Sequence, residues 1–175
     1  ALSLNDKIHL SLKKNLKLSF ELYQQVKINL HKIGFIEMPI PHKILNNPRS
    51  DWTHNYNKKY YRNLDLVQST NIALKNMERL SNLLKQNNIG LSVAVYPVPG
   101  TLKYDVENNR QVQLWNNFCS INCMKFYNLM TPFFNMLNNE SFSSVYKRIY
   151  IKDDIHFNEE GNRIIAESFL KLYSK

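Results

Sequence analysis

The sequence predicts an α/β protein, in which helices alternate with the short buried strands of a parallel sheet. A helical pattern, a short polar break and an apolar run follow one another between positions 66 and 96, which is the order of one half of an α/β unit. The chain of 175 residues, 43% of them apolar, is also long enough to bury one core. We therefore expect residues 1–175 to form a single domain or the C-terminal portion of one.

Residues 1–65 are predicted to form a long helix and then an irregular excursion rich in aromatic residues. Apolar residues recur at steps of three and four from Leu12 to Ile33, the pattern of one buried helix face, and Gly34 is a natural stop. The following stretch carries three prolines among many Asn, Lys and Tyr residues, which indicates a loop over the surface. Its aromatic residues either pin the loop to the core or line a substrate cleft. Trp52 and Tyr56 are the candidates for substrate binding.

Residues 66–175 are predicted to supply the α/β part. Apolar spacing predicts a helix from about 66 to 87, ended by Asn and Gly residues. A buried strand is expected over 89–96, leaving the sheet at a rigid turn rich in proline. A helix over 106–118 and a short strand over 125–129 follow.

The C-terminal elements are predicted from three further patterns. The segment 132–137 is predicted to be helical, and alternating β-branched and aromatic residues over 145–151 indicate an approach to the sheet edge. Asn158 is the predicted N-cap of the last helix, because acidic residues follow it in the first turn. The expected core face of that helix consists of Ile164, Ile165, Phe169, Leu170 and Leu172.

The net charge of +9 raises nucleic acid or an anionic surface as a partner. The basic residues are mostly lysines scattered among asparagines, however, and form no stripe with interleaved aromatic residues. We therefore expect no nucleic-acid partner. No apolar run approaches the roughly 18 residues that a membrane-spanning helix requires, so no transmembrane segment is expected in this chain.

Cys119 and Cys123 are the two cysteines of the chain. Two thiols are too few for a structural zinc site, and their spacing is not that of a Cys-x-x-Cys redox motif. They form either a local disulfide in an oxidising compartment or a pair of half-buried thiols.

The segment Asp153-Asp154-Ile155-His156-Phe157-Asn158 is the strongest candidate for a functional site. A histidine base needs a carboxylate on one ring nitrogen, which leaves the other nitrogen to deprotonate a nucleophile. His156 has carboxylates two and three residues before it, in a loop ahead of a helix, where α/β folds place their sites. A metal site is not expected, because no second Asp/His cluster completes one.

This block, continued by Glu159-Glu160-Gly161-Asn162 and an apolar helix, resembles the last conserved block of the SGNH/GDSL hydrolase superfamily, in which Asp-x-x-His precedes the C-terminal helix. The resemblance implies a three-layer α/β/α, flavodoxin-like domain with a parallel sheet, with His156 as general base and Asp153 as orienting acid. Asp154 is the alternative acid, since some relatives place it two residues before the histidine. The stretch 93–119 also resembles a bacterial subgroup found beside acyltransferases of cell-surface polysaccharides.

The chain lacks the two other blocks of that superfamily. No Gly-Asp-Ser nucleophile block and no Gly-x-Asn-Asp oxyanion block occur, and the nearest serine, Ser50, has an aspartate but no glycine beside it. The resemblance therefore covers roughly residues 66–175. Either the chain is the C-terminal part of such a domain, or it is an inactive relative.

The resemblance implies a serine esterase or O-acyltransferase that acts on an ester, with a carbohydrate as the expected acceptor or substrate and with no cofactor or metal. It also implies an extracytoplasmic or periplasmic bacterial location. The alternative is a non-catalytic carbohydrate-binding module of the same fold. The sequence leaves the oligomeric state, the acyl group and the acceptor open.

Overall fold

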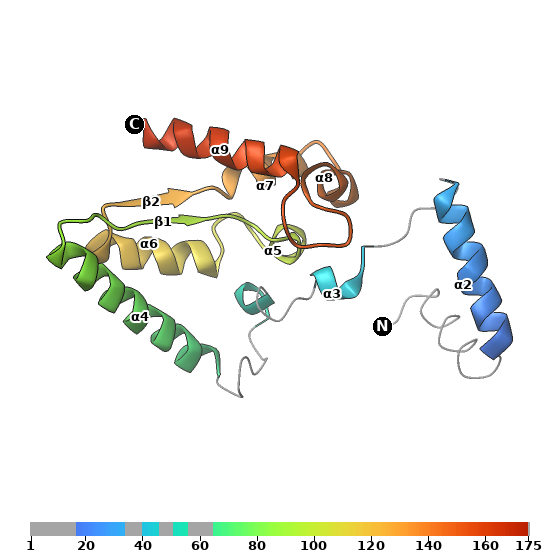
Figure 1. Ribbon diagram of the computed structural model, residues 1–175, viewed down its shortest axis with the longest axis horizontal. Helices are drawn as coiled ribbons and strands as arrows, with labels where there is room; N and C mark the ends of the chain where they lie inside the picture. Colours follow the sequence, from blue (N-terminus) through green and yellow to red (C-terminus); the bar gives the residue numbers. More distant parts are fainter. Residues whose placement is uncertain (1–16, 34–39, 46–50, 56–64, 175) are drawn as a thin grey trace. The chain divides into compact units, whose positions relative to one another are not determined.

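The computed structural model of the protein describes residues 17–33, 40–45, 51–55 and 65–174. The chain divides into two compact units, residues 1–39 and 40–175 (Figure 1). In order, the elements are α2 (Lys17–Lys32), α3 (His42–Leu45), the 3-10 helix η1 (Asp51–Thr53), α4 (Leu66–Gln86), β1 (Ser92–Val95), α5 (Pro99–Tyr104), α6 (Arg110–Asn122), β2 (Lys125–Asn128), α7 (Thr131–Leu137), α8 (Phe142–Ile149) and α9 (Glu159–Tyr173). The first unit contributes α2 and the second unit contributes the other elements.

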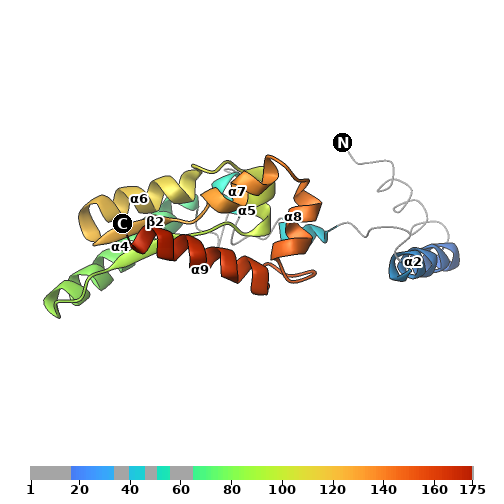
Figure 2. The same cartoon turned by 90° about the horizontal axis from the view of Figure 1, so that it is seen from above.

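The second unit is an α/β structure built on a parallel pair of strands. Ser92 of β1 lies opposite Lys125 of β2, and Val95 lies opposite Asn128. The strands lie between α6 and α9 in both views of the molecule (Figures 1 and 2). Both strands contact α6, while the rings of Tyr127 in β2 and Phe169 in α9 lie 4.8 Å apart. The predicted mixture of helices with a parallel sheet is thus confirmed.

Local sequence signals explain where the two longest helices of this unit begin. The Asp65 carboxylate accepts a hydrogen bond from the Gln68 N–H at 2.7 Å, and the Gln68 side chain accepts one from the Asp65 N–H, which is a complete capping box. Asn158 caps α9 with its side chain alone, which accepts a bond from the Gly161 N–H at 3.1 Å. The predicted helix at 66–87 and the predicted N-cap at Asn158 are both confirmed.

Two apolar clusters form the core of this unit. The larger one joins α3, α5, α7, α8 and α9 through Ile44, Leu102, Phe133, Val145, Tyr146, Ile149, Tyr150, Phe157 and Ile164. The smaller one joins β1 to α6 and the start of α7 through Val95, Val112 and Met130. In α9, Ile164 is buried as expected, whereas Leu170 is 59% exposed, so that part of the predicted core face is wrong.

Four predicted elements differ from the structure. The turn after β1 continues into α5, with Pro99 at a first-turn position where its missing N–H costs nothing. The helix expected from 106 begins at Arg110, because the Asn109 side chain caps that point. The segment 145–151, expected to approach the sheet edge with an alternating pattern, is mostly α8, whose buried residues are Val145, Tyr146 and Ile149. The strand expected to be buried over 89–96 is β1, and only its last residue, Val95, is buried.

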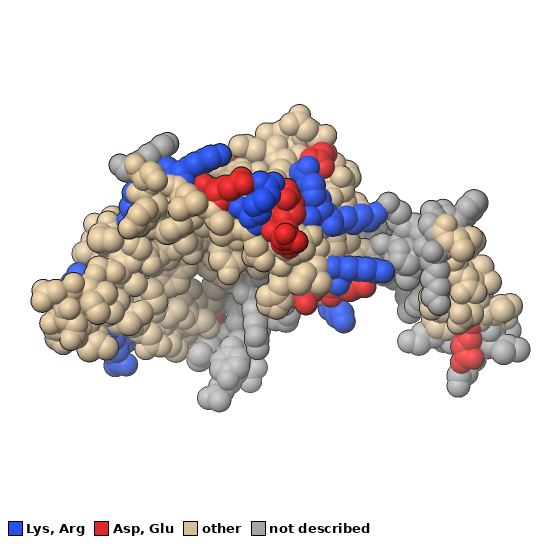
Figure 3. Space-filling view, turned by 45° about the horizontal axis from the view of Figure 1, so that its top comes forward, with Lys and Arg blue, Asp and Glu red and all other residues tan. Residues whose placement is uncertain are grey.

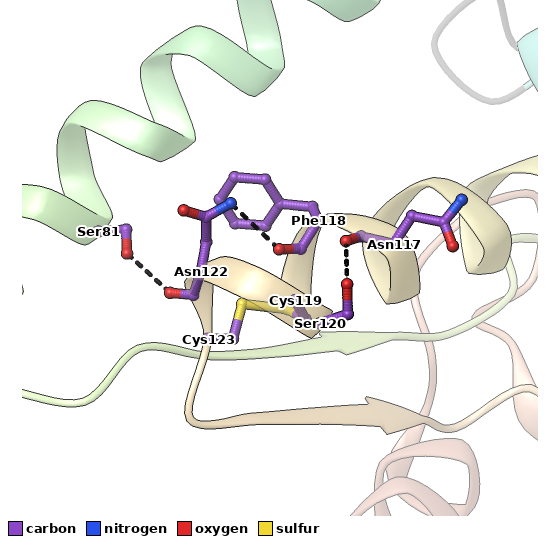
Figure 4. Close-up of a disulfide and its surroundings, with 7 residues drawn as sticks. All are labelled: Ser81, Asn117, Phe118, Cys119, Ser120, Asn122 and Cys123. Carbon is purple, nitrogen blue, oxygen red and sulfur yellow. Dashed lines mark hydrogen bonds between the residues drawn. A yellow bond between two sulfur atoms is a disulfide. The ribbon is translucent and has the colours of Figure 1, made fainter.

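A disulfide joins Cys119 in the last turn of α6 to Cys123, the residue that caps this helix (Figure 4). The Cys123 N–H also donates to the Cys119 carbonyl at 3.2 Å. Beside it, the Ser81 hydroxyl of α4 donates to the Asn122 carbonyl at 2.7 Å. The disulfide alternative is therefore the one found, and it lies where α4, α6 and the start of β2 meet.

Charged side chains gather in pairs on the surface over α8 and α9. Arg163 bonds to Glu160 and to Glu167 on α9, and Arg148 bonds to Glu140 at 2.7 Å. Figure 3 shows acidic and basic groups alternating across this area. Among the helices that the structure describes, none is long and apolar enough to cross a membrane.

Candidate active site

The loop between α8 and α9 lies at the carboxyl end of β1. The Tyr150 hydroxyl, at the start of the loop, donates to the Pro97 carbonyl just after β1 at 2.9 Å. At the other end of the loop, the ring of Phe157 lies 5.9 Å from that of Tyr96. The carboxyl edge of a parallel sheet is where α/β proteins place their sites. Tyr150 and Phe157, which flank the Asp/His segment, therefore lie near this edge of the sheet.

Backbone pairing closes this loop at its base. Tyr150 and Phe157 form an antiparallel bridge and their rings stack, with centroids 4.6 Å apart. Within the loop, the Ile151 N–H donates to the His156 carbonyl at 2.9 Å. The Asn158 side-chain amide donates to the Tyr150 carbonyl at 3.3 Å, which links the loop to the cap of α9. These contacts join the two ends of the loop and fix the backbone conformation at its base.

His156 and Asp154 form a hydrogen-bonded pair at the tip of the loop. The ring Nδ1 of His156 lies 2.7 Å from Oδ1 of Asp154. A carboxylate at Nδ1 favours the tautomer that carries its proton there, which leaves Nε2 as a base. The His156 side chain is 74% exposed, and its Nε2 has no partner within the described part of the chain. This nitrogen is accessible to a reacting group.

The Asp154 carboxylate accepts backbone hydrogen bonds besides the contact with the histidine ring. Its Oδ1 also accepts a bond from the Ile155 N–H at 2.6 Å. The hydrogen bond from His156, followed by that from the Ile155 N–H, lowers the pKa of Asp154 from its usual value. The carboxyl is therefore ionised over the range in which a neutral histidine acts as a base.

The Tyr146 hydroxyl of α8 holds the backbone of Asp154. It donates to the Asp154 carbonyl at 3.0 Å and accepts from the Asp154 N–H at 3.2 Å. Burial raises the pKa of Tyr146, so its hydroxyl keeps its proton and can fill both roles. One phenol thus anchors the residue that orients the histidine.

The remaining predicted site residues lie apart from this pair. Asp153 is exposed and has a φ of 59°, and no bond joins it to His156 in the described structure. Trp52 is half-buried in η1, which contacts α5. Tyr56 and Ser50 lie outside the described residues. The structure therefore brings together His156 and the alternative acid, Asp154.

Sequence reasoning missed the two tyrosines that position the loop, Tyr146 and Tyr150. Both fell in a segment expected to approach the sheet edge. The available signal for a helix was Ser141, an N-cap residue whose side chain accepts a bond from the Ser144 N–H.

Groups of three or more His, Cys, Asp or Glu side chains that could hold a metal ion do not occur among the described residues. Comparison of the chain with models of protein families, with curated proteins and with solved structures found no match.

Proposed function

We propose that His156 and Asp154 are the general base and the orienting acid of an SGNH-type serine esterase or O-acyltransferase. The observation that carries this proposal is the 2.7 Å contact between Nδ1 and Oδ1, in a loop at the carboxyl end of β1 and directly before α9. The pair supplies two of the three groups of a serine hydrolase triad. The corresponding fold is the three-layer, flavodoxin-like SGNH domain.

In this proposal Nε2 of His156 takes the proton of a serine hydroxyl as its oxygen attacks the carbonyl carbon of an ester. The same nitrogen then returns the proton to the leaving alcohol as the ester C–O bond breaks. Asp154 keeps Nδ1 protonated and stabilises the imidazolium that forms between these steps. Water or a second hydroxyl then takes the acyl group from the serine.

The chain contains neither the Gly-Asp-Ser nucleophile block nor the Gly-x-Asn-Asp oxyanion block of that superfamily. Residues 1–175 alone are therefore expected not to turn over. The substrate class is an ester, with a carbohydrate as the acyl acceptor or donor, and an extracytoplasmic location is supported by the Cys119–Cys123 disulfide.

The test is hydrolysis of 4-nitrophenyl acetate by the protein expressed from its complete reading frame. His156→Ala is expected to lower kcat by about 10²- to 10⁴-fold while the circular dichroism spectrum is retained. His42→Ala, on the exposed side of α3, is the matched control and should leave kcat unchanged. Full activity of His156→Ala would refute the proposal.

The two acids are separated by the same assay. Asp154→Asn should cost far more activity than Asp153→Asn, because only Asp154 contacts the imidazole in this structure. An amide at position 154 can hold the imidazole in the wrong tautomer. If Asp153→Asn is the more damaging change, Asp153 is the orienting acid.

A further inference from the structure

The amino ends of β1 and β2 lie at the end of the second unit opposite the His156 loop. The helices α4, α6 and α9 all finish at this same end in both views of the molecule (Figures 1 and 2). Hydrogen bonds join these segments. The Met124 N–H donates to the Leu91 carbonyl at 2.7 Å, and the Lys125 Nζ donates to the Leu172 carbonyl of α9 at 2.8 Å. Segments that are distant in the sequence thus meet at one end of the sheet.

Four large apolar or aromatic side chains are exposed at this end, and together we call them the amino-end face: Ile89, Ile121, Met124 and Tyr173. Ile121 and Met124 are 81% and 71% exposed, more than any other large apolar side chain described in the second unit. A Cβ at Gly90 would meet the Met124 sulfur at 2.9 Å, so Met124 lies against the residue that follows Ile89. Apolar groups gathered in this way mark an interaction surface.

The Cys119–Cys123 disulfide fixes how two of these side chains are presented. Ile121 lies inside the loop that the disulfide closes, and Met124 is the next residue after it. Cys119 is buried, and residues two apart on a helix point in nearly opposite directions. Ile121 therefore points away from the core. The bridge limits the freedom of this backbone to fold the two side chains back.

Three lysines surround the amino-end face. Lys85 and Lys171 lie in the last turns of α4 and α9, and Lys125 is the first residue of β2. The Lys125 ammonium is bonded to a backbone carbonyl and not to a carboxylate. The apolar stem of a lysine can lie along an apolar surface while its ammonium group reaches a phosphate.

Acidic residues are sparse around these lysines. The chain contains no Asp or Glu between positions 79 and 104, or between 108 and 139. On α9 the acid nearest to this end is Glu167, which is paired with Arg163. The left end of the second unit in Figure 3 accordingly shows tan and blue atoms without red. The amino-end face therefore carries a net positive charge.

We propose that the amino-end face binds the surface of an anionic lipid bilayer. Ile89, Ile121 and Met124 enter the boundary between headgroups and acyl chains, where their burial is favourable. Tyr173 lies at the level of the headgroups, the region in which tyrosine is enriched in membrane proteins. The three lysines contact lipid phosphates.

The distribution of the apolar groups favours a bilayer over a protein partner. Protein interfaces are packed surfaces whose core is enriched in aromatic residues and arginine and depleted of lysine. Here single side chains project from a loop, from two helix ends and from the residue before a strand, and the cations are lysines. A fluid bilayer fills the space between separate side chains, and anionic headgroups complement the lysines.

Binding through this face would orient the molecule. The His156 loop lies at the carboxyl end of β1, so it would face away from the bilayer into the aqueous phase. The proposal does not depend on the proposed function, since lipid binding is measured without turnover.

Cosedimentation of the 175-residue chain with lipid vesicles tests the proposal. The chain should bind vesicles made of equal parts of phosphatidylcholine and phosphatidylglycerol, and should bind vesicles of phosphatidylcholine alone more weakly. Ile121→Ser/Met124→Ser should weaken binding by about 10-fold or more, because it removes two apolar side chains that the bilayer buries. Both positions are exposed, so the urea unfolding curve should be unchanged.

The matched control for this variant is Val67→Ser/Val106→Ser, which removes two exposed apolar side chains from the first turn of α4 and from the loop after α5. It should bind vesicles as the parent chain does. The absence of binding by the parent chain, or equal binding by the two double variants, would overturn the proposal.

The contribution of the lysines is tested separately. Lys85→Gln/Lys171→Gln should weaken binding to the anionic vesicles by about fivefold for each lysine and leave binding to phosphatidylcholine unchanged. Lys75→Gln/Lys147→Gln changes the net charge equally at exposed positions of α4 and α8, and should have a smaller effect. An equal loss in the two variants would show that net charge alone drives binding and would overturn the proposal.

Insertion into the bilayer is measured with lipids brominated in their acyl chains. The added fluorescence of Ile121→Trp should be quenched by these lipids, whereas that of Val67→Trp should not. Unquenched fluorescence of Ile121→Trp in the presence of vesicles would overturn the proposal. So would a dimer in sedimentation equilibrium that Ile121→Ser/Met124→Ser dissociates while the parent chain binds no vesicles, since a second copy would then cover the face.

Discussion

The ring of Tyr150 stacks on that of Phe157 at 4.6 Å, and the backbones of these two residues form the bridge that closes the candidate site loop. The stack continues to Phe133, whose ring lies 4.9 Å from that of Phe157. An aromatic layer beneath the loop thus supports His156, which is itself exposed. We expect the stability of this layer to influence how firmly the loop that carries His156 is held.

Gly161→Ala tests the contact between the loop and α9. A Cβ at position 161 would collide with the Ile149 carbonyl and the Phe157 ring. We expect the free energy of unfolding to fall by about 1–3 kcal/mol, as in other overpacked sites, measured by urea denaturation. Gly90→Ala is the matched control, since its Cβ would meet only the flexible side chain of Met124, at 2.9 Å from the sulfur. Equal stability of the two variants would contradict the packing described for α9.

Tyr146→Phe tests the anchor of Asp154. Loss of the hydroxyl removes both bonds to the Asp154 backbone and should cost about 0.5–1.5 kcal/mol in the free energy of unfolding. The ring nitrogen shifts of His156, measured by NMR, should move toward those of a histidine without a carboxylate partner. Tyr173→Phe, at an exposed position of α9, serves as the control. Unchanged His156 shifts in Tyr146→Phe would show that the anchor is dispensable.

The carboxyl of Asp154 is expected to titrate below the usual aspartate pKa of 3.8. Because its pKa is lower in the folded than in the unfolded state, its contribution to stability is present above pH 3.8 and is lost as the pH falls through the folded-state value. A ¹³C NMR titration of the side-chain carboxyl measures this midpoint. His156→Ala should raise it, since the histidine is the main cause of the shift. An unchanged titration midpoint of Asp154 in His156→Ala would contradict the contact between the two side chains.

Reduction of the Cys119–Cys123 disulfide should destabilise the protein modestly. The bridge closes a loop of only a few residues, for which the chain-entropy estimate is about 2 kcal/mol. Denaturant unfolding with and without dithiothreitol measures the difference. The free energy of unfolding of the double variant Cys119→Ser/Cys123→Ser should be the same with and without dithiothreitol. Two free thiols in the non-reduced protein, found by mass spectrometry after alkylation, would show that the bridge is absent.

The elements predicted best from the sequence are those for which the helix cap and the apolar periodicity both indicate a helix. α4 combines a capping box with a helical apolar pattern, and α9 combines an asparagine cap with two glutamates in its first turn. The segment around α8 was ambiguous, because a short run that contains Val145 and Ile149 fits alternation as well as helical spacing. The burial of both residues against α5 and α9 decides for the helix, and a local pattern does not contain that information.

Local sequence features likewise predicted one part of the candidate site, and the other part depends on the folded backbone. His156 was predicted because its carboxylate neighbours and the helix start are local features of the sequence. Asp153 was predicted as the acid with Asp154 as the alternative, and the contact to the imidazole is made by Asp154, because the backbone turn decides which carboxylate faces the ring. Asp153 adopts a positive φ of 59°, a conformation that aspartate tolerates better than most residues, and the turn at this point presents Asp154 to the ring.

Asp154 and His156 are two residues apart in a loop that is closed by its own backbone bonds. Their mutual geometry is therefore a short-range property that a shift of the sheet, of α4 or of any neighbouring chain would barely alter. Only the distance from Nε2 to a hydroxyl depends on tertiary assembly. If the proposed function is correct, activity would depend on how the serine is brought to Nε2, while the contact between Asp154 and His156 is already formed.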